Sequence, residues 1–201
     1  MNKDIIINHA FKFGYGGMAK NELAFLYGIC ENKTVLELGS YIGQSSYVIA
    51  HTVKSLTCVD AWDDDYDHLN HDIKQKVEYL NSPELKTNTI FNQFLENCKY
   101  FIECNKIHYL KGLTKNVVNN FKENEFDMII IDADHSYEGV YSDITNYISK
   151  LKCDGLLIFH DYGSHKWDGV KQACDQSILE NKIKYNTQYG SLGLFTVIGN
   201  N

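Results

Sequence analysis

A glycine turn flanked by two carboxylates is the part of this chain whose residue types and spacing most clearly suggest chemistry. The apolar run 34–38 contains Glu37 and leads into Gly39, with Gly43 four positions later. A strand, a glycine turn and a helix bring backbone N–H groups toward a ligand at the carboxyl edge of a parallel sheet. Asp60 ends the next apolar run, 21 positions after Gly39. This spacing predicts a second carboxylate at the tip of a neighbouring strand.

These groups favour S-adenosylmethionine over a dinucleotide as the ligand. Dinucleotide sites use the pattern G-x-G-x-x-G, whereas this chain has E-x-G-x-x-x-G without the middle glycine. Glu37 would repel a pyrophosphate but suits the ammonium of an amino-acid moiety. Asp60 can accept hydrogen bonds from both hydroxyls of a ribose. The competing interpretation is a tight turn with a strand-terminal glutamate of no function.

A second group of acids follows later strands. Asp132 ends the apolar run 127–132, and Asp161 follows the run 155–160. Neighbouring parallel strands end at the same edge, so the two carboxylates could share a cation, and carboxylates with waters suit Mg²⁺. The imidazole of His160 favours Mn²⁺ or Fe²⁺ instead, or a site without metal. Alternatively, Asp161 caps a loop and His160 packs under the edge of the sheet.

His135 is the candidate general base. It lies three positions after Asp132, at the start of a helix predicted over 136–150. Its unperturbed pKa lies near neutrality, which suits removal of a proton from an alcohol or phenol. Asp134 could orient His135 or be the base itself, and His160 completes the candidate catalytic residues. The alternative is a solvated residue at a helix N-terminus, tied to Asp134.

Composition limits the class of protein. A chain of 201 residues with 44% hydrophobic content can bury one core, which predicts one domain over 1–201. It has no apolar run long enough for a membrane span and no signal-peptide pattern at its N-terminus. Six cysteines without a C-x-x-C pair favour reduced thiols and a cytoplasmic location. The net charge of −7 argues against a nucleic-acid partner, so a small-molecule acceptor is expected; the oligomeric state stays open.

The elements that must position these residues alternate along the chain. Apolar runs predict strands, and amphipathic patterns between them predict helices. This alternation predicts an α/β fold with a mostly parallel seven-stranded sheet and helices on both faces. The last two runs predict a C-terminal antiparallel hairpin. Residues 1–30 are expected to form an N-terminal lid and helix, and 63–101 a polar helical insertion. The predicted strands are 34–38, 56–60, 107–110, 127–132, 155–160, 183–188 and 192–198.

The ordered motifs resemble those of the class I S-adenosylmethionine-dependent methyltransferases. The segment 36–43 (LELGSYIG) looks like the motif of the catechol O-methyltransferase type. The segments 130–140 (IIDADHSYEGV) and 155–162 (GLLIFHDY) are similar to those of bacterial small-molecule and sugar O-methyltransferases. The macrolide-sugar methyltransferases and the cephalosporin-hydroxylase-like proteins lie near this group. The resemblance runs from about residue 14 to the C-terminus and implies a Rossmann-like fold.

The resemblance also implies roles for individual residues. The first motif and the acid after the second strand would hold S-adenosylmethionine, and Asp132 is also expected among the cofactor-binding residues. Relatives use the position of His135 or Asp134 as general base. Metal-dependent relatives have two consecutive acidic or Asn ligands after the fifth strand, where this chain has His160 and Asp161. The implied cofactor contacts are Glu37 with the amino group, Gly39, Ser40, Tyr41 and Gly43 with the methionine and sulfonium, Asp60 with the ribose, and Ala61, Trp62 and Thr114 with the adenine.

The expected activity is transfer of a methyl group to an oxygen of a small polar acceptor. A sugar hydroxyl is the first candidate acceptor and a phenol the second. Mg²⁺ or Mn²⁺ at Asp132 and Asp161 stays an open alternative to a metal-free site. A non-catalytic cofactor-binding or scaffold protein and a nicotinamide-dependent oxidoreductase are the rival interpretations.

Overall fold

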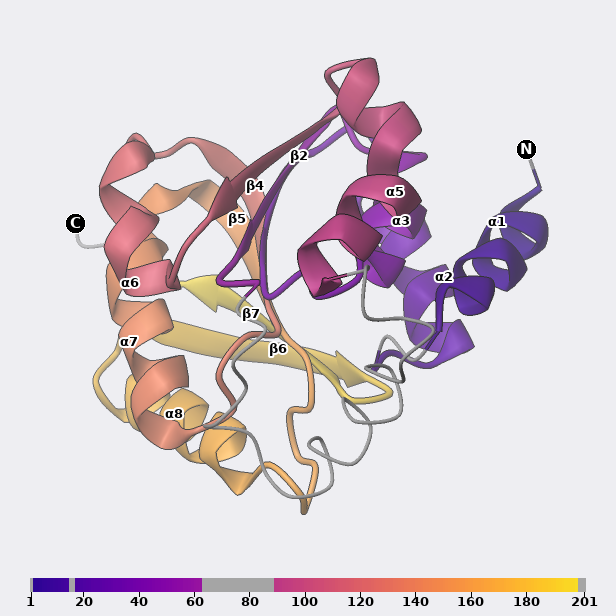
Figure 1. Cartoon of the computed structure of the whole chain (residues 1–201). Helices are drawn as coiled ribbons and strands as arrows, with labels where there is room; N and C mark the ends of the chain where they lie inside the picture. Colours follow the sequence, from indigo (N-terminus) through magenta and orange to yellow (C-terminus); the bar gives the residue numbers. More distant parts are fainter. Residues whose placement is uncertain (1, 15–16, 63–88, 199–201) are drawn as a thin grey trace.

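The computed structural model describes residues 2–14, 17–62 and 89–198 and contains one seven-stranded sheet (Figure 1). The strand order is β3-β2-β1-β4-β5-β7-β6. Strands β1 to β5 are parallel, and β7 pairs antiparallel with both β5 and β6. The predicted fold class and the C-terminal hairpin are therefore confirmed. The strands are β1 Thr34–Leu38, β2 Ser55–Asp60, β3 Ile107–Lys111, β4 Phe126–Ile131, β5 Leu151–Phe159, β6 Ile183–Tyr189 and β7 Leu192–Val197.

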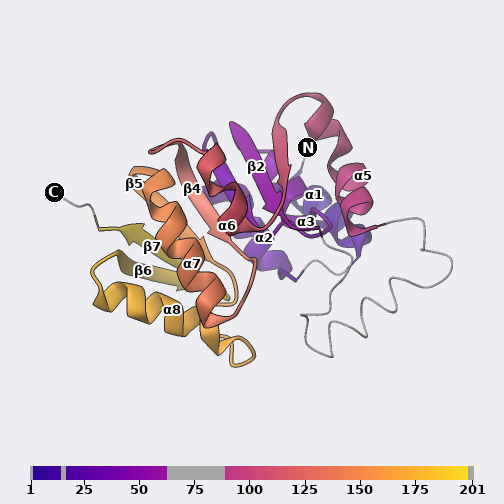
Figure 2. The ribbon, with the colours of Figure 1, turned by 60° about the vertical axis from the view of Figure 1, so that its left-hand side comes forward.

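Helices cover both faces of the sheet, as Figure 2 shows. Successive strand side chains point to opposite faces. Val35 therefore packs with α1, α2, α3 and α5, while Leu36 packs with α7 and α8. Two separate apolar clusters fix the sheet between the two layers. The helices are α1 Lys3–Ala10, α2 Lys20–Ile29, α3 Gln44–Ala50, α5 Ile90–Glu103, α6 Thr114–Val117, α7 Tyr137–Tyr147 and α8 Asp168–Leu179.

The N-terminal segment contains a helix that the sequence analysis did not identify. Asn2 caps α1 by accepting a hydrogen bond from the backbone N–H of Asp4 at 2.8 Å. Ile6 and Ile7 of this helix are buried. An Asn before a short apolar run is a signal for the start of a helix, so the sequence around Asn2 did contain a signal for α1. The lid predicted within residues 1–30 lies partly outside the described residues, because 1 and 15–16 are not described.

The predicted insertion at 63–101 is described only from residue 89 onward. Its described part contains α5, one of the helices that pack on the sheet. Phe94 and Cys98 are fully buried against the rest of the protein, which confirms the predicted helix at this end. Within residues 2–14, 17–62 and 89–198, none of the helices is long and apolar enough to cross a membrane.

The turn after β1 requires glycine at both predicted positions. Gly39 has φ +89° and Gly43 has φ +83°, a region that a residue without Cβ enters readily. A Cβ on Gly39 would lie 2.0 Å from the backbone oxygen of Asp132, and one on Gly43 would lie 2.7 Å from Cys98 Sγ. The turn therefore packs against both the loop after β4 and α5.

Replacing Gly39 with Ala should destabilise the protein strongly. The added Cβ collides with backbone atoms in a conformation that disfavours side chains, and such overpacking and strain together reduce the unfolding free energy by about 2–5 kcal/mol. Urea unfolding followed by circular dichroism measures the change. Gly28→Ala is the matched control, because no atom lies within 4 Å of its added Cβ and Ala favours helix by up to about 1 kcal/mol. Equal losses in both variants would contradict this assignment.

Candidate functional site

Two bulky residues at the carboxyl edge of the sheet have left-handed backbone conformations. Tyr41, after β1, has φ 47°, and Trp62, after β2, has φ 40°. Large side chains rarely adopt this region, and residues held in it cluster where ligands bind. Asp161, after β5, has φ 58°. Among the described residues, Tyr41 and Trp62 are the only positive-φ residues other than Gly, Asn and Asp, which indicates a binding site at this edge.

Glu37 lies beneath the glycine turn with no exposed surface. Its carboxylate accepts hydrogen bonds from Ser40 Oγ at 2.9 Å, from Ser45 Oγ at 2.6 Å and from Ser46 Oγ. Burial raises the pKa of Glu37, and the three hydroxyls partly oppose that rise. In this structure Glu37 therefore has no surface that could contact an ammonium group directly, contrary to the expectation. The carboxylate is enclosed and already partnered, so its role is to anchor the turn.

Asp60 joins the loops after β1 and β2. Its Oδ2 accepts from the backbone N–H of Tyr41 at 2.8 Å, and its Oδ1 accepts from the N–H of Trp62 at 2.7 Å. Burial raises the pKa of Asp60, and these backbone N–H groups oppose the rise. A carboxylate has about four acceptor positions. Asp60 therefore keeps acceptor capacity beyond its backbone partners, and its contact with a ribose stays a prediction.

Trp62 belongs to the core. Its side chain is fully buried, its ring packs on Phe91 and Phe94 at centroid distances of 5.0 and 4.5 Å, and Nε1 donates to the backbone oxygen of Tyr41 at 2.7 Å. The indole has no exposed surface in this structure, and a position of residue 62 beside an adenine stays a prediction. Ala61, which precedes it, stays partly exposed.

Thr114 begins α6 and connects it to α7. Its hydroxyl donates to Asp143 Oδ1 at 2.6 Å, and its backbone oxygen accepts from the hydroxyl of Tyr147 at 2.7 Å. Burial raises the pKa of Asp143 to about 6. The hydroxyl of Thr114 thus has a partner within the protein, and its contact with an adenine stays a prediction.

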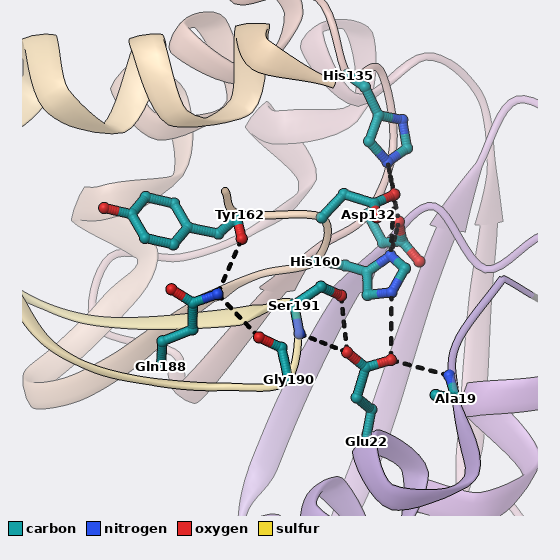
Figure 3. Close-up of polar contacts among 10 residues, drawn as sticks. Ala19, Glu22, Asp132, His135, His160, Tyr162, Gln188, Gly190 and Ser191 are labelled. Atoms are coloured by element: carbon teal, nitrogen blue, oxygen red, sulfur yellow. Dashed lines mark hydrogen bonds and ion pairs between the residues drawn. The ribbon is translucent and has the colours of Figure 1, made fainter. Parts of the chain in front are cut away.

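Two histidines and two aspartates meet at the ends of β4 and β5, as predicted for Asp132 and Asp161. Nε2 of His135 lies 3.3 Å from Asp132 Oδ1 and 3.2 Å from Asp161 Oδ2. Nδ1 of His160 lies 3.0 Å and 3.5 Å from the same two oxygens. One donor atom from each residue lies within 4.8 Å of all the others, a separation that allows one metal ion to contact them. Figure 3 shows how these side chains converge.

The two imidazoles carry charge when no cation neutralises the carboxylates. Burial alone would lower both pKa values, but Asp132 and Asp161 outweigh it and raise the pKa of His135 to about 9. The same acids and Glu22 raise the pKa of His160 to about 11. The two histidines in turn outweigh the effect of burial on Asp132 and hold its pKa below the usual range. In this state His135 is protonated at neutral pH, so its expected role as a base requires that the carboxylates be neutralised.

Asp134 is not part of the group formed by Asp132, His135, His160 and Asp161, although it lies next to His135 in the sequence. Its side chain is exposed, and its Oδ1 accepts from the backbone N–H of Ser136 at 2.8 Å. Ser136 in turn caps α7 by accepting from the N–H of Gly139 at 3.1 Å. These contacts give Asp134 a place in the start of α7, and its alternative role as a base stays a prediction.

Two residues that the sequence analysis did not assign to the site support the histidines from outside. Trp167 packs on the ring of His135 with the centroids 4.7 Å apart. Glu22 of α2 lies with Oε2 3.7 Å from His160 Nε2 (Figure 3). Burial raises the pKa of Glu22, but His160 and the N–H groups of Ala19 and Ser191 outweigh it and lower the pKa to about 2. Neither residue belongs to a motif, so only a charged position within an apolar helix face hinted at Glu22.

Comparisons with known proteins agree with this geometry. A family model described as a methyltransferase domain matches residues 36–162. No curated protein sequence matches the chain. Among solved structures, an O-methyltransferase from Bacillus cereus in complex with S-adenosylhomocysteine (SAH) has a TM-score of 0.67 at 13% identity, covering 99% of this chain and 93% of that one.

Two further solved structures share the fold. An SAH-bound methyltransferase from Podospora anserina has a TM-score of 0.66 at 13% identity, covering 97% of this chain and 87% of that one. A ribosomal protein L11 methylase from Lactobacillus delbrueckii has a TM-score of 0.57 at 18% identity, covering 91% and 81%. Identities this low concern the fold alone, and the acceptor classes in these names differ.

The charged histidines predict a pH dependence of stability in protein treated with a chelator. Their folded pKa values lie above the unfolded value of about 6.5, so their contribution is complete below about pH 6.5. It is then lost as the pH rises through about 9 for His135. Urea unfolding at pH 6.5, 8 and 9.5 should therefore show a declining free energy. The decline should be smaller in Asp132→Asn and unchanged in His108→Gln, which alters an exposed histidine of β3. A midpoint near 6.5 for His135 in an NMR titration of the wild type would contradict the prediction.

Proposed function

Because the chain belongs to the methyltransferase family whose model covers residues 36–162, we propose that it transfers a methyl group from S-adenosylmethionine to an oxygen of a small polar acceptor. A sugar hydroxyl is the preferred acceptor and a phenol the second candidate. The observation that carries the proposal is the position of His135 Nε2. This atom lies 3.3 Å from Asp132 Oδ1 and 3.2 Å from Asp161 Oδ2, at the same edge of the sheet as the loops after β1 and β2.

The residues at the first two loops fit the cofactor. S-adenosylmethionine supplies a methyl group on a positively charged sulfur. Asp60 would accept from the ribose with its remaining acceptor capacity, and the turn from Gly39 to Gly43 would let the backbone approach the methionine part closely. Ser40 and Tyr41 would line that part, with Ala61 and Thr114 on the adenine side. Glu37 would act from below, by holding the turn in place.

Transfer to oxygen requires that a proton leave the acceptor hydroxyl, and the second group of residues can provide for it. A cation such as Mg²⁺ or Mn²⁺ at Asp132 and Asp161 would neutralise the charges that keep His135 protonated. His135 could then accept the proton of the hydroxyl at Nε2. The ring contact with Trp167 would hold the imidazole in the orientation that this step needs.

The negative net charge of the chain is the reason for proposing a small acceptor over a nucleic acid. The net charge of −7 opposes binding to a phosphate backbone, since such binding depends on clustered Lys and Arg side chains. A neutral hydroxyl compound meets no such repulsion. The group formed by Asp132, His135, His160 and Asp161 also suits an acceptor oxygen. Its carboxylates and imidazoles can accept the proton of a hydroxyl, and a bound cation would lower the pKa of that hydroxyl.

Replacing Asp60 with Ala should weaken SAH binding about 10- to 100-fold, because hydrogen bonds to a charged group contribute about 1.5–3 kcal/mol. Isothermal titration calorimetry with SAH measures the change. Asp175→Ala is the control, since Asp175 is an acid of α8 that pairs on the surface with Lys171. Thermal melting of both variants separates lost binding from lost folding. Equal affinity for SAH in the wild type and Asp60→Ala would remove Asp60 from the cofactor site.

Replacing His135 with Gln should reduce methyl transfer about 10²- to 10⁴-fold, the usual contribution of a general base. SAH affinity should stay within about twofold of the wild type, because His135 acts on the acceptor. The assay follows radiolabelled methyl transfer from S-adenosylmethionine to a panel of methyl glycosides and 3,4-dihydroxybenzoate. Asp134→Asn, tested in parallel, should keep most of the activity. If Asp134→Asn loses the activity and His135→Gln keeps it, the roles of the two residues are reversed.

A further inference from the structure

The edge of the sheet holds an imidazole where an oxygen donor would complete a magnesium site. Asp132 Oδ1 and Asp161 Oδ2 lie 3.0 and 3.5 Å from Nδ1 of His160. Donors about 2.1 Å from one ion are separated by roughly 3.0 Å at octahedral and about 3.4 Å at tetrahedral angles. The two distances from His160 Nδ1 therefore match those between ligands of a common ion, and all the donor atoms of the group lie within 4.8 Å of one another.

We propose that Glu22 positions His160 so that its Nδ1 becomes a ligand, and that this nitrogen makes the site select Mn²⁺ or Zn²⁺ over Mg²⁺. The inference rests on the proposed function only in that the same aspartates serve both. It extends the site to α2, a helix that lies before the part of the chain matched by the family model.

Glu22 is built into the protein as a fixed carboxylate. It is 5% exposed, and its Oε1 accepts from the backbone N–H and the hydroxyl of Ser191 at 2.6 and 2.7 Å. Its Oε2 accepts from the N–H of Ala19 at 2.8 Å. The turn between β6 and β7 leaves room for it, because a Cβ on Gly190 would lie 2.6 Å from Oε1. Two distant segments of the chain thus hold this side chain in place.

The carboxylate of Glu22 lies on the side of the His160 ring that faces away from the aspartates. Oε2 of Glu22 lies 3.7 Å from Nε2, on the side of the ring opposite to Nδ1. A carboxylate at one imidazole nitrogen keeps a proton there, which leaves the other nitrogen as a metal donor and increases its basicity. Loss of such an outer partner lowers metal affinity about 10- to 100-fold.

The proposed metal preference follows from the types of donor atom, which are two carboxylate oxygens and an imidazole nitrogen. Mg²⁺ prefers six oxygens and keeps several waters, whereas imidazole suits borderline ions. His135 Nε2 lies 3.2–3.3 Å from the same aspartate oxygens. An ion between these oxygens would therefore bring a bound water or acceptor hydroxyl within reach of this nitrogen. The competing arrangement is a metal-free site in which His160 serves as a permanent ion-pair partner of Asp132.

Calorimetric titration of chelator-treated protein with Mn²⁺, Zn²⁺ and Mg²⁺ tests the inference. The wild type should bind Mn²⁺ at least about 100-fold more tightly than Mg²⁺. His160→Ala should lose at least about tenfold in Mn²⁺ affinity, and Glu22→Gln about 10- to 100-fold. His108→Gln should bind as the wild type does. Equal affinity of the wild type for Mg²⁺ and Mn²⁺ would overturn the selectivity, and unchanged affinity in Glu22→Gln would overturn the positioning role.

A spectroscopic measurement on folded wild-type protein guards against variants that fail to fold. Pulsed electron paramagnetic resonance of bound Mn²⁺ detects a directly bonded imidazole nitrogen. The signal should be present in the wild type and in His135→Gln, which assigns it to His160. Absence of nitrogen coupling in the wild type would overturn the inference.

SAH titration of the same samples distinguishes this inference from the proposed function. SAH binding without any divalent-ion binding would overturn the metal site and leave methyl transfer by a metal-free mechanism. Metal binding without SAH binding would contradict the proposed function while supporting the metal site. Loss of both would overturn both proposals.

Discussion

The need to satisfy one buried carboxylate organises the loops after β1 and β2, where we propose that the cofactor binds. An ionised carboxylate in a protein interior is strongly unfavourable unless hydrogen bonds surround it. Glu37 meets that need with three serine hydroxyls, one from the turn after β1 and two from the first turn of α3. The turn and the start of α3 are therefore tied to the end of β1 from below. This arrangement points the backbone N–H of Tyr41 at Asp60 and leaves the other side of the turn for a ligand.

A backbone contact joins the loop after β1, which is part of the proposed cofactor site, to the loop after β4, which carries Asp132 and His135. The N–H of Asp132 donates to the oxygen of Leu38 at 2.8 Å, and the loop after β4 passes so close to Gly39 that a Cβ there would collide with it. The two loops cannot move apart without breaking the packing of β1 against β4. In the proposed reaction this contact would align the methyl donor with the acceptor, because in-line transfer depends on the relative position of the reacting groups.

Segments outside the part matched by the family model complete the second half of the site. Glu22 comes from α2 and Ser191 from the turn between β6 and β7, and they meet at His160. The matched part, residues 36–162, carries the sheet edge and both proposed binding groups. The outer segments decide how one of its histidines is oriented. In the metal site that we propose, residues far from the motifs would thus influence which metal binds.

Strands, helices and the residues at the carboxyl edge could be predicted because they depend on local pattern. Apolar runs indicate buried strands, glycines indicate turns, and parallel order brings the ends of successive strands together. Asp60, Asp132 and Asp161 were located in this way. Burial, partners and charge depend instead on which distant side chains meet. The enclosure of Glu37, the core position of Trp62 and the raised pKa of His135 therefore followed only from the tertiary structure, since each results from contacts that no local pattern encodes.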